Sequence, residues 1–213
     1  MAEAAEALMS DSRETILGRV RSALAPLPRR AGLPDWSGRL ITPRQASGEG
    51  ADPWETFSGR MQAAHGVALA GGGELVALMR KNGWRHGYID PALGDLRKML
   101  ESAGITLEAT FERARVDDYQ FGITAAMGAI AETGTLLLSD RSTSSRLAAL
   151  APWVHVAVVR RERIFPDFVT AIAAFGDDPN IIWVTGPSKT ADIEGILIEG
   201  VHGPGVQVAL LAE

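Results

Sequence analysis

From Val67 onward, short apolar runs alternate with segments of helical periodicity, and this alternation limits the possible folds more than any other feature. The apolar runs have the length of buried strands and cover residues 67–70, 86–90, 154–159, 181–184 and 206–211. Between them, residues such as Leu93, Leu96 and Leu100 recur at helical spacing. The pattern predicts an α/β layered sandwich with a mainly parallel sheet. Ligands of such sheets bind outside the carboxyl ends of the strands.

The N-terminal part differs from this pattern. Residues 11–24 have the spacing of an amphipathic helix, which Pro26 ends, and residues 26–52 are rich in Pro, Gly, Ser and Arg. We therefore expect an N-terminal helix and irregular connection over residues 1–50 and an α/β domain over residues 51–213. The apolar face of the helix packs either on its own domain or on a neighbouring subunit. Asp52 and Pro53 mark the start of the next helix.

Composition excludes several classes of function. The net charge of −5 argues against binding to nucleic acid or to an anionic membrane. The chain has no cysteine, which excludes disulfides and a thiolate-held metal or iron–sulfur cluster within it. The start of the chain lacks the pattern of a secretory signal, and the longest apolar tract, residues 147–159, is broken and short. We expect a cytoplasmic protein without a membrane span.

A single carboxylate, Glu132, lies between two strand-like runs in the stretch from Phe121 to Asp140. Gly134 follows it where the backbone needs positive φ or a close approach. Glu132 therefore either caps backbone amides or faces a ligand. Paired support is the commoner role for a carboxylate near a core. A pKa raised by burial would instead let Glu132 act as a general acid, base or nucleophile.

Several loops carry groups that suit an anion. A helix follows the three glycines Gly71, Gly72 and Gly73, which form either a plain turn or a phosphate cradle. Another strand leads into Ser188, Lys189, Thr190 and Asp192, where the hydroxyls either cap a helix or bind a carboxylate or phosphate. We expect residues 71–73, 141–146 and 186–194 to gather at the carboxyl ends of the strands.

The remaining candidates are arginines and histidines. Arg141 and Arg146 either clamp a carboxylate or are simply solvated. His202 is an exposed loop residue or a general base, and His155, flanked by valines, is expected to be a hydrogen-bonded core residue. No spacing typical of a metal site occurs. The candidate catalytic residues are thus Glu132 and His202, and the candidate ligand-binding residues are Gly71, Gly72, Gly73, Thr133, Gly134, Arg141, Arg146, Ser188, Lys189, Thr190 and Asp192.

Four ordered blocks resemble a known family. They are IAETGTLLL from Ile130, PWVHVAVV from Pro152, GPSKTADIE from Gly186 and GVHGP from Gly200. Together they are similar to the LUD domain, and specifically to the lactate-utilisation protein C family. The resemblance implies a fold like that of the NagB/RpiA/CoA-transferase superfamily. It also implies that the chain acts with two iron–sulfur partner proteins in oxidising L-lactate to pyruvate. This cysteine-free chain would then be the component without clusters.

The resemblance also bears on the candidate residues. Class I CoA transferases of the related fold use a catalytic Glu in a Gly-containing turn, to which Glu132 is similar in kind. Relatives often carry a polar or acidic residue before this block, whereas Ala125, Ala126, Met127 and Gly128 stand here, which argues against a two-carboxylate mechanism. Three functions follow: a cytoplasmic subunit of an L-lactate oxidation system that binds a small anion, a free-standing isomerase or CoA transferase using Glu132, or a non-catalytic binding module.

Overall fold

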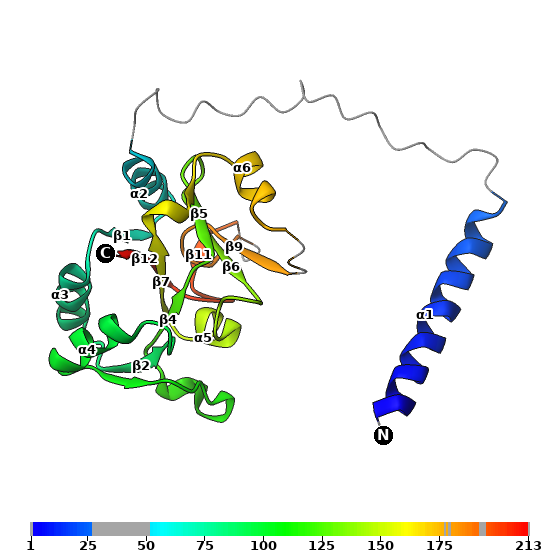
Figure 1. Cartoon of the computed structure of the whole chain (residues 1–213), viewed down its shortest axis with the longest axis horizontal. Helices are drawn as coiled ribbons and strands as arrows, with labels where there is room; N and C mark the ends of the chain where they lie inside the picture. The colour runs from blue at the N-terminus through cyan, green and yellow to red at the C-terminus, as the bar shows by residue number, and fades with distance from the viewer. Residues whose placement is uncertain (1, 27–51, 177, 179, 192–194, 213) are drawn as a thin grey trace. The chain divides into compact units, whose positions relative to one another are not determined.

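The computed structural model describes residues 2–26, 52–176, 178, 180–191 and 195–212. The chain divides into two units, one containing α1 (Ala2–Leu24) and the other everything from α2 (Pro53–Ala63) to β12 (Val206–Ala212) (Figure 1). The predicted N-terminal helix is present and begins at Ala2, earlier than expected. Within its own unit, α1 leaves Ile16, Val20 and Leu24 exposed. None of the helices in the described ranges is long and apolar enough to cross a membrane.

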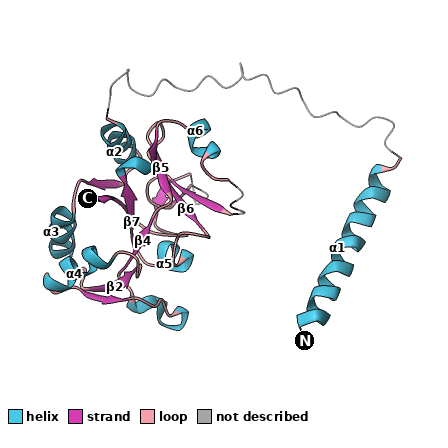
Figure 2. Ribbon diagram, viewed as in Figure 1, coloured by secondary structure: helices cyan, strands magenta, loops and turns pink. Residues whose placement is uncertain are grey.

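The larger unit is built on a six-stranded central sheet (Figure 2). Its members are β1 (Val67–Leu69), β2 (His86–Ile89), β3 (Thr106–Glu108), β4 (Phe121–Ala125), β7 (Val154–Arg160) and β12. Their order is β1-β12-β7-β4-β2-β3, and each pair of neighbours is parallel. The predicted α/β fold with a mainly parallel sheet is therefore confirmed.

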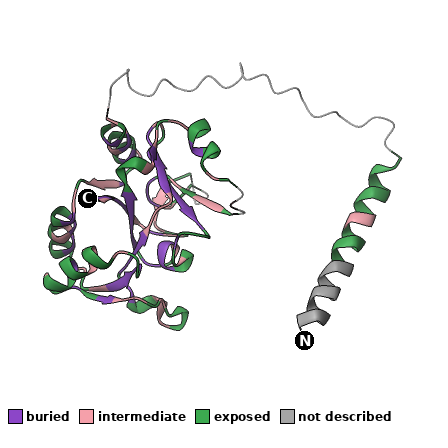
Figure 3. Cartoon of the chain, viewed as in Figure 1, coloured by how far each residue is buried: buried purple, intermediate pink, exposed green. Residues whose placement is uncertain are grey.

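Alternation along the strands divides the core into two layers. On β7, Val154, Val156 and Val158 pack with α3 (Gly72–Asn82) and α4 (Gly94–Ser102), whereas Ala157 and Val159 pack with α2. The inner strands β4, β7 and β12 are mostly buried, as Figure 3 shows, because helices or a second sheet cover each face. The apolar runs of the sequence reflect this burial on both faces.

The second sheet was not predicted. It has the order β8-β5-β6-β9, and its strands are β8 (Ile164–Phe165), β5 (Gly128–Ile130), β6 (Thr135–Ser139) and β9 (Ile181–Val184). The β5–β6 and β6–β9 pairs are antiparallel, while β5 and β8 are parallel. The stretch from Phe121 to Asp140 thus forms three strands instead of two, because the chain passes from β4 into the second sheet at Ala126 and Met127.

One predicted helix is wrong at its start. The apolar spacing of Ile164, Phe165, Phe168, Val169 and Ile172 predicts a helix that starts at Ile164, but β8 comes first and α6 (Phe168–Ala173) begins only after Pro166. Proline lacks the N–H that a helix interior needs. Asp167 then caps α6 by accepting the Thr170 N–H at 2.7 Å. The other short elements are α5 (Arg146–Leu150), the antiparallel pair β10 (Lys189–Thr190) and β11 (Ile198–Glu199), and 3-10 segments at Arg113–Asp118 and Arg161–Arg163.

Helix α2 begins as its sequence predicts. The Asp52 carboxylate accepts the Trp54 N–H at 2.9 Å, and Pro53 is the first helical residue. This backbone hydrogen bond, followed by the ion pair with Arg161, holds the pKa of Asp52 below its usual value. The helix buries Trp54, Phe57 and Met61 at helical spacing, and so brings its C-terminal end to the start of β1.

Candidate functional site

The three glycines lie at the carboxyl end of β1, at the beginning of α3. Gly71 is the N-cap and Gly72 is buried. The Cβ position of Gly72, where an added Cβ atom would lie, is 2.5 Å from the Met99 Sδ atom. The Glu74 carboxylate accepts the Ala70 N–H at 2.9 Å and so occupies one amide at this helix start. Gly72 therefore allows α3 to pack closely against α4, which is the packing role of a plain turn.

The turn that carries Glu132 packs against the second half of α2. Glu132 is half-buried, and its backbone N–H donates to the Pro166 carbonyl at 3.1 Å. Gly134 has a φ of 67°, and its Cβ position lies 2.4 Å from the Met61 backbone nitrogen. The turn thus needs glycine both for its conformation and for the approach of α2.

A chain of hydroxyls links this turn to the end of β9. The Thr133 and Thr135 side-chain oxygens are 2.7 Å apart, and Thr135 is 2.7 Å from Thr185. Gly186 follows, with its Cβ position 2.2 Å from the Ala64 carbonyl oxygen at the C-cap of α2. The hydroxyls therefore connect the Glu132 turn to the loop that carries Ser188 and Lys189.

Lys189 caps α2. Its Nζ donates to the Ala64 carbonyl at 2.8 Å and lies 3.6 Å from the Glu199 carboxylate, which also contacts His65 at 2.7 Å. A cation at a helix C-terminus interacts favourably with the carbonyls and the helix dipole. The Lys189 charge therefore supports the end of α2, a role that differs from both sequence alternatives for this loop, a helix cap and an anion site.

Ser188 fixes the loop that contains His202. Its backbone N–H donates to the Pro204 carbonyl at 2.9 Å and its carbonyl accepts the Gly200 N–H at 2.9 Å. His202 itself is exposed. Ser188 does not cap a helix, because Lys189 and Thr190 form a strand that pairs with β11. A helix capped by Thr190 would begin in residues that lie partly outside the described ranges. Asp192 lies outside the described residues.

The loop at residues 141–146 is tied to its surroundings by several hydrogen bonds. Arg146 pairs with Asp140 at 2.7 Å, and the Arg141 N–H donates to the Ser139 hydroxyl at 3.0 Å. Ser139 also bonds the Asp178 carboxylate, which is the main cause of the lowered pKa of Asp178. The Arg146 charge is thus paired within the loop.

The structure brings only some of the candidates together. Thr133, Gly134 and Lys189 lie along the second half of α2, and Ser188 joins the His202 loop just before β12. The glycines at residues 71–73 lie at the opposite, carboxyl edge of the central sheet. The expected gathering of three loops is wrong for residues 186–191, because they follow β9 of the second sheet, to which the rule for parallel strands does not apply. The loop at residues 141–146 does reach the carboxyl edge, since the Thr143 hydroxyl donates to the carbonyl of Ala125, the last residue of β4, at 3.3 Å.

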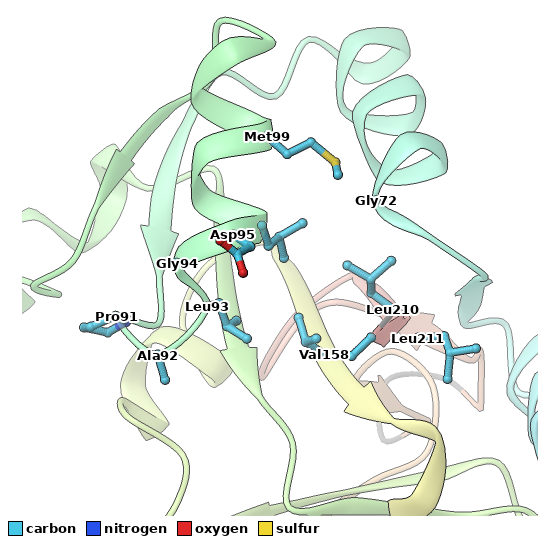
Figure 4. Close-up of a pocket in the computed structure, with 12 residues that line it drawn as sticks. Gly72, Pro91, Ala92, Leu93, Gly94, Asp95, Met99, Val158, Leu210 and Leu211 are labelled. Atoms are coloured by element: carbon cyan, nitrogen blue, oxygen red, sulfur yellow. The ribbon is translucent and has the colours of Figure 1, made fainter.

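The carboxyl edge of the central sheet carries a cavity of about 570 Å³ (Figure 4). It lies between the starts of α3 and α4 and the ends of β7 and β12, and its apolar lining is formed by Leu93, Leu96, Met99, Val158, Leu210 and Leu211. The sequence predicts ligands at this edge, but the helical spacing of Leu93, Leu96 and Met99 predicts side chains that face the core. The signal that could have located the cavity is the carboxyl-end rule applied to β7 and β12.

A buried polar triad crosses three central strands. The His155 Nε2 lies 2.9 Å from the Thr124 hydroxyl, and its Nδ1 lies 3.0 Å from the Gln207 amide oxygen. Burial lowers the pKa of His155 to about 4, although the Gln207 hydrogen bond acts in the opposite direction. His155 is thus the hydrogen-bonded core residue that the sequence predicted. Among the residues described, no cluster of His, Cys, Asp or Glu could hold a metal ion.

The fold and these sites define an α/β protein with a mainly parallel central sheet and a smaller second sheet. A crystal structure of a DUF162 family protein from Deinococcus radiodurans superposes with a TM-score of 0.52 at 22% identity, covering 75% of this chain and 96% of that one. The LUD domain family model matches residues 96–211. The chain belongs to the LUD domain family.

Relatives share part of this sequence. Lactate utilization protein C from Deinococcus radiodurans is 35% identical over 135 residues, which are 55% of this chain and 64% of that protein. The protein of the same name from Macrococcus caseolyticus is 35% identical over 142 residues, covering 63% of this chain and 59% of the relative. The matches thus span less than two thirds of the length of these relatives.

Proposed function

We propose that this protein is a cytoplasmic component of an L-lactate utilisation system that oxidises lactate to pyruvate. The observation that carries the proposal is its membership of the LUD domain family together with its similarity to proteins named lactate utilization protein C. Electrons removed from lactate need a redox group, and iron–sulfur clusters are held mainly by cysteine thiolates. This chain has no cysteine and so supplies no thiolate ligand. In this proposal the iron–sulfur clusters therefore belong to partner proteins.

Within this function, we assign Glu132 as the candidate reacting carboxylate and His202 as a candidate base. Half-burial of Glu132 in a turn fixed by Gly134 supports a positioned carboxylate. The small anion would be a carboxylate, with Thr133 and Ser188 supplying hydroxyl donors. In one alternative, a free-standing isomerase or CoA transferase, Glu132 would take part in catalysis by the isolated chain. In the other, a non-catalytic module, Glu132 would have no catalytic role.

The full chain, tagged and purified from its own cells grown on L-lactate, should bring iron-containing, cysteine-rich partners with it. Iron content and mass spectrometry identify the partners, and lactate-dependent dye reduction reports the activity of the assembly. In a Glu132→Gln strain the same partners and iron should be recovered, while dye reduction falls by at least about a hundredfold, the lower end of the range for loss of a general acid or base.

Three other results would change the assignment. Isolation of the chain without iron proteins would contradict the proposed system. Unchanged dye reduction by the Glu132→Gln assembly would remove Glu132 from the reaction. Turnover of a sugar phosphate or an acyl-CoA by the isolated chain would favour the free-standing enzyme.

A further inference from the structure

The cavity at the carboxyl edge takes no part in the function proposed above. At about 30 Å³ for each water-sized group, the heavy atoms of a three-carbon acid such as lactate would occupy only about a third of its 570 Å³. Cavities of this size usually enclose larger organic ligands. The apolar side chains Leu93, Leu96 and Met99 remain partly exposed around it, in contrast to the buried Leu100 on the same helix.

A cation lines a second hollow that adjoins this cavity. Arg160 follows Val158 on the same face of β7 and lines an adjoining hollow of about 450 Å³, with which the cavity shares Leu211 and Ala212. Its Nε is 3.6 Å from the Glu162 carboxylate, and both side chains are about 70% exposed. Such an exposed pair is weak, which leaves the guanidinium able to exchange Glu162 for a ligand.

The other charged side chains near the cavity also have partners, although the Asp95–Lys98 pair is as exposed as the Arg160–Glu162 pair. Arg161 binds both Asp52 oxygens at 2.9 and 2.7 Å. Asp95 contacts Lys98 at 3.1 Å. The buried Asp90 accepts the Ala92 N–H at 2.9 Å. An incoming anion would therefore meet carboxylates that already have partners.

We propose that this cavity binds an organic anion larger than lactate, with its apolar body against Leu93, Leu96 and Met99 and its charged group at Arg160. The site is separate from the Glu132 turn, and the inference does not depend on the lactate assignment. The charged group is a carboxylate, sulfonate or phosphate, for which a guanidinium has matching geometry.

Two fluorescent probes with the same aromatic body test this site on the full chain. They are the anion 8-anilinonaphthalene-1-sulfonate and the uncharged N-phenyl-1-naphthylamine. Leu93→Trp, which fills the cavity, should weaken binding of both probes at least about tenfold. Arg160→Gln should weaken the anion about three- to tenfold and leave the uncharged probe unchanged.

The matched control is Ile172→Glu on the exposed apolar surface of α6, where Phe168 and Val169 are also exposed. It should leave the binding of both probes unchanged. If Ile172→Glu abolishes binding and Leu93→Trp does not, the probes bind at α6 and the proposal is wrong. Equal effects of Arg160→Gln on both probes would remove the anionic part of the proposal. If the circular dichroism of Leu93→Trp shows that the variant does not fold, Met99→Trp replaces it, because Met99 lines the same cavity at a more exposed position. Unchanged binding of both probes to Met99→Trp would contradict the proposed site.

Discussion

Gly134→Ala is expected to lower the free energy of unfolding by about 2–5 kcal/mol. An alanine at a φ of 67° costs about 1–2 kcal/mol. Its Cβ would also lie 2.4 Å from the Met61 nitrogen, and overpacking costs about 1–3 kcal/mol more. The displaced atoms are backbone atoms of α2, which cannot move as a side chain can. Urea unfolding followed by circular dichroism measures the change.

Gly104→Ala is the matched control for this prediction. Gly104 also has a positive φ, of 84°, but no atom lies within 4 Å of its Cβ position. The control should therefore show only the conformational cost, about 1–2 kcal/mol. If Gly134→Ala is no more destabilising than Gly104→Ala, the turn does not pack against α2 as described.

Acidification should destabilise the protein through His155. Burial lowers the pKa of His155 to about 4, whereas a histidine in an unfolded chain titrates near 6.5. Between these values the unfolded chain binds a proton that the folded protein does not. The free energy of unfolding should therefore fall by about 3 kcal/mol as the pH drops from 6.5 to 4, and His155 should contribute no pH dependence above pH 7.

A triple variant isolates this effect from the titration of carboxylates. Thr124→Val, His155→Leu and Gln207→Leu together replace the triad by apolar groups, and replacing hydrogen-bonding partners together costs little. His155→Leu alone leaves two buried polar groups unpaired and should cost roughly 2–4 kcal/mol at pH 7. Urea unfolding at pH 7 and pH 4 should show a loss about 3 kcal/mol smaller in the triple variant than in the unmodified protein. Equal losses would show that His155 is not the titrating group.

The elements that could be predicted from sequence are those whose signals are local. Asp52 and Pro53 mark the start of α2 because the cap and the fixed φ act within one helical turn. The central strands were found because burial on both faces leaves continuous apolar runs. Pro166 is also a local signal, and the helix predicted from Ile164 did not take it into account.

The second sheet and the candidate site depend on contacts between distant residues. Nothing near Gly128 indicates that β5 pairs with β8 instead of joining the central sheet. Lys189 contacts the carbonyl of Ala64, 125 residues earlier in the chain, so its capping role has no local pattern. The cavity forms where α3, α4, β7 and β12 fail to fill the space between them, and apolar spacing cannot distinguish a lining residue such as Met99 from a core residue.

Growth on L-lactate tests the central claim most directly. A strain that lacks the gene for this protein is compared with its parent on L-lactate and on pyruvate as the only carbon source, with the intact gene reintroduced as a control. We expect the strain to stop growing on L-lactate, to grow normally on pyruvate and to recover with the intact gene. Growth on L-lactate at the parental rate without the gene would contradict the proposed function.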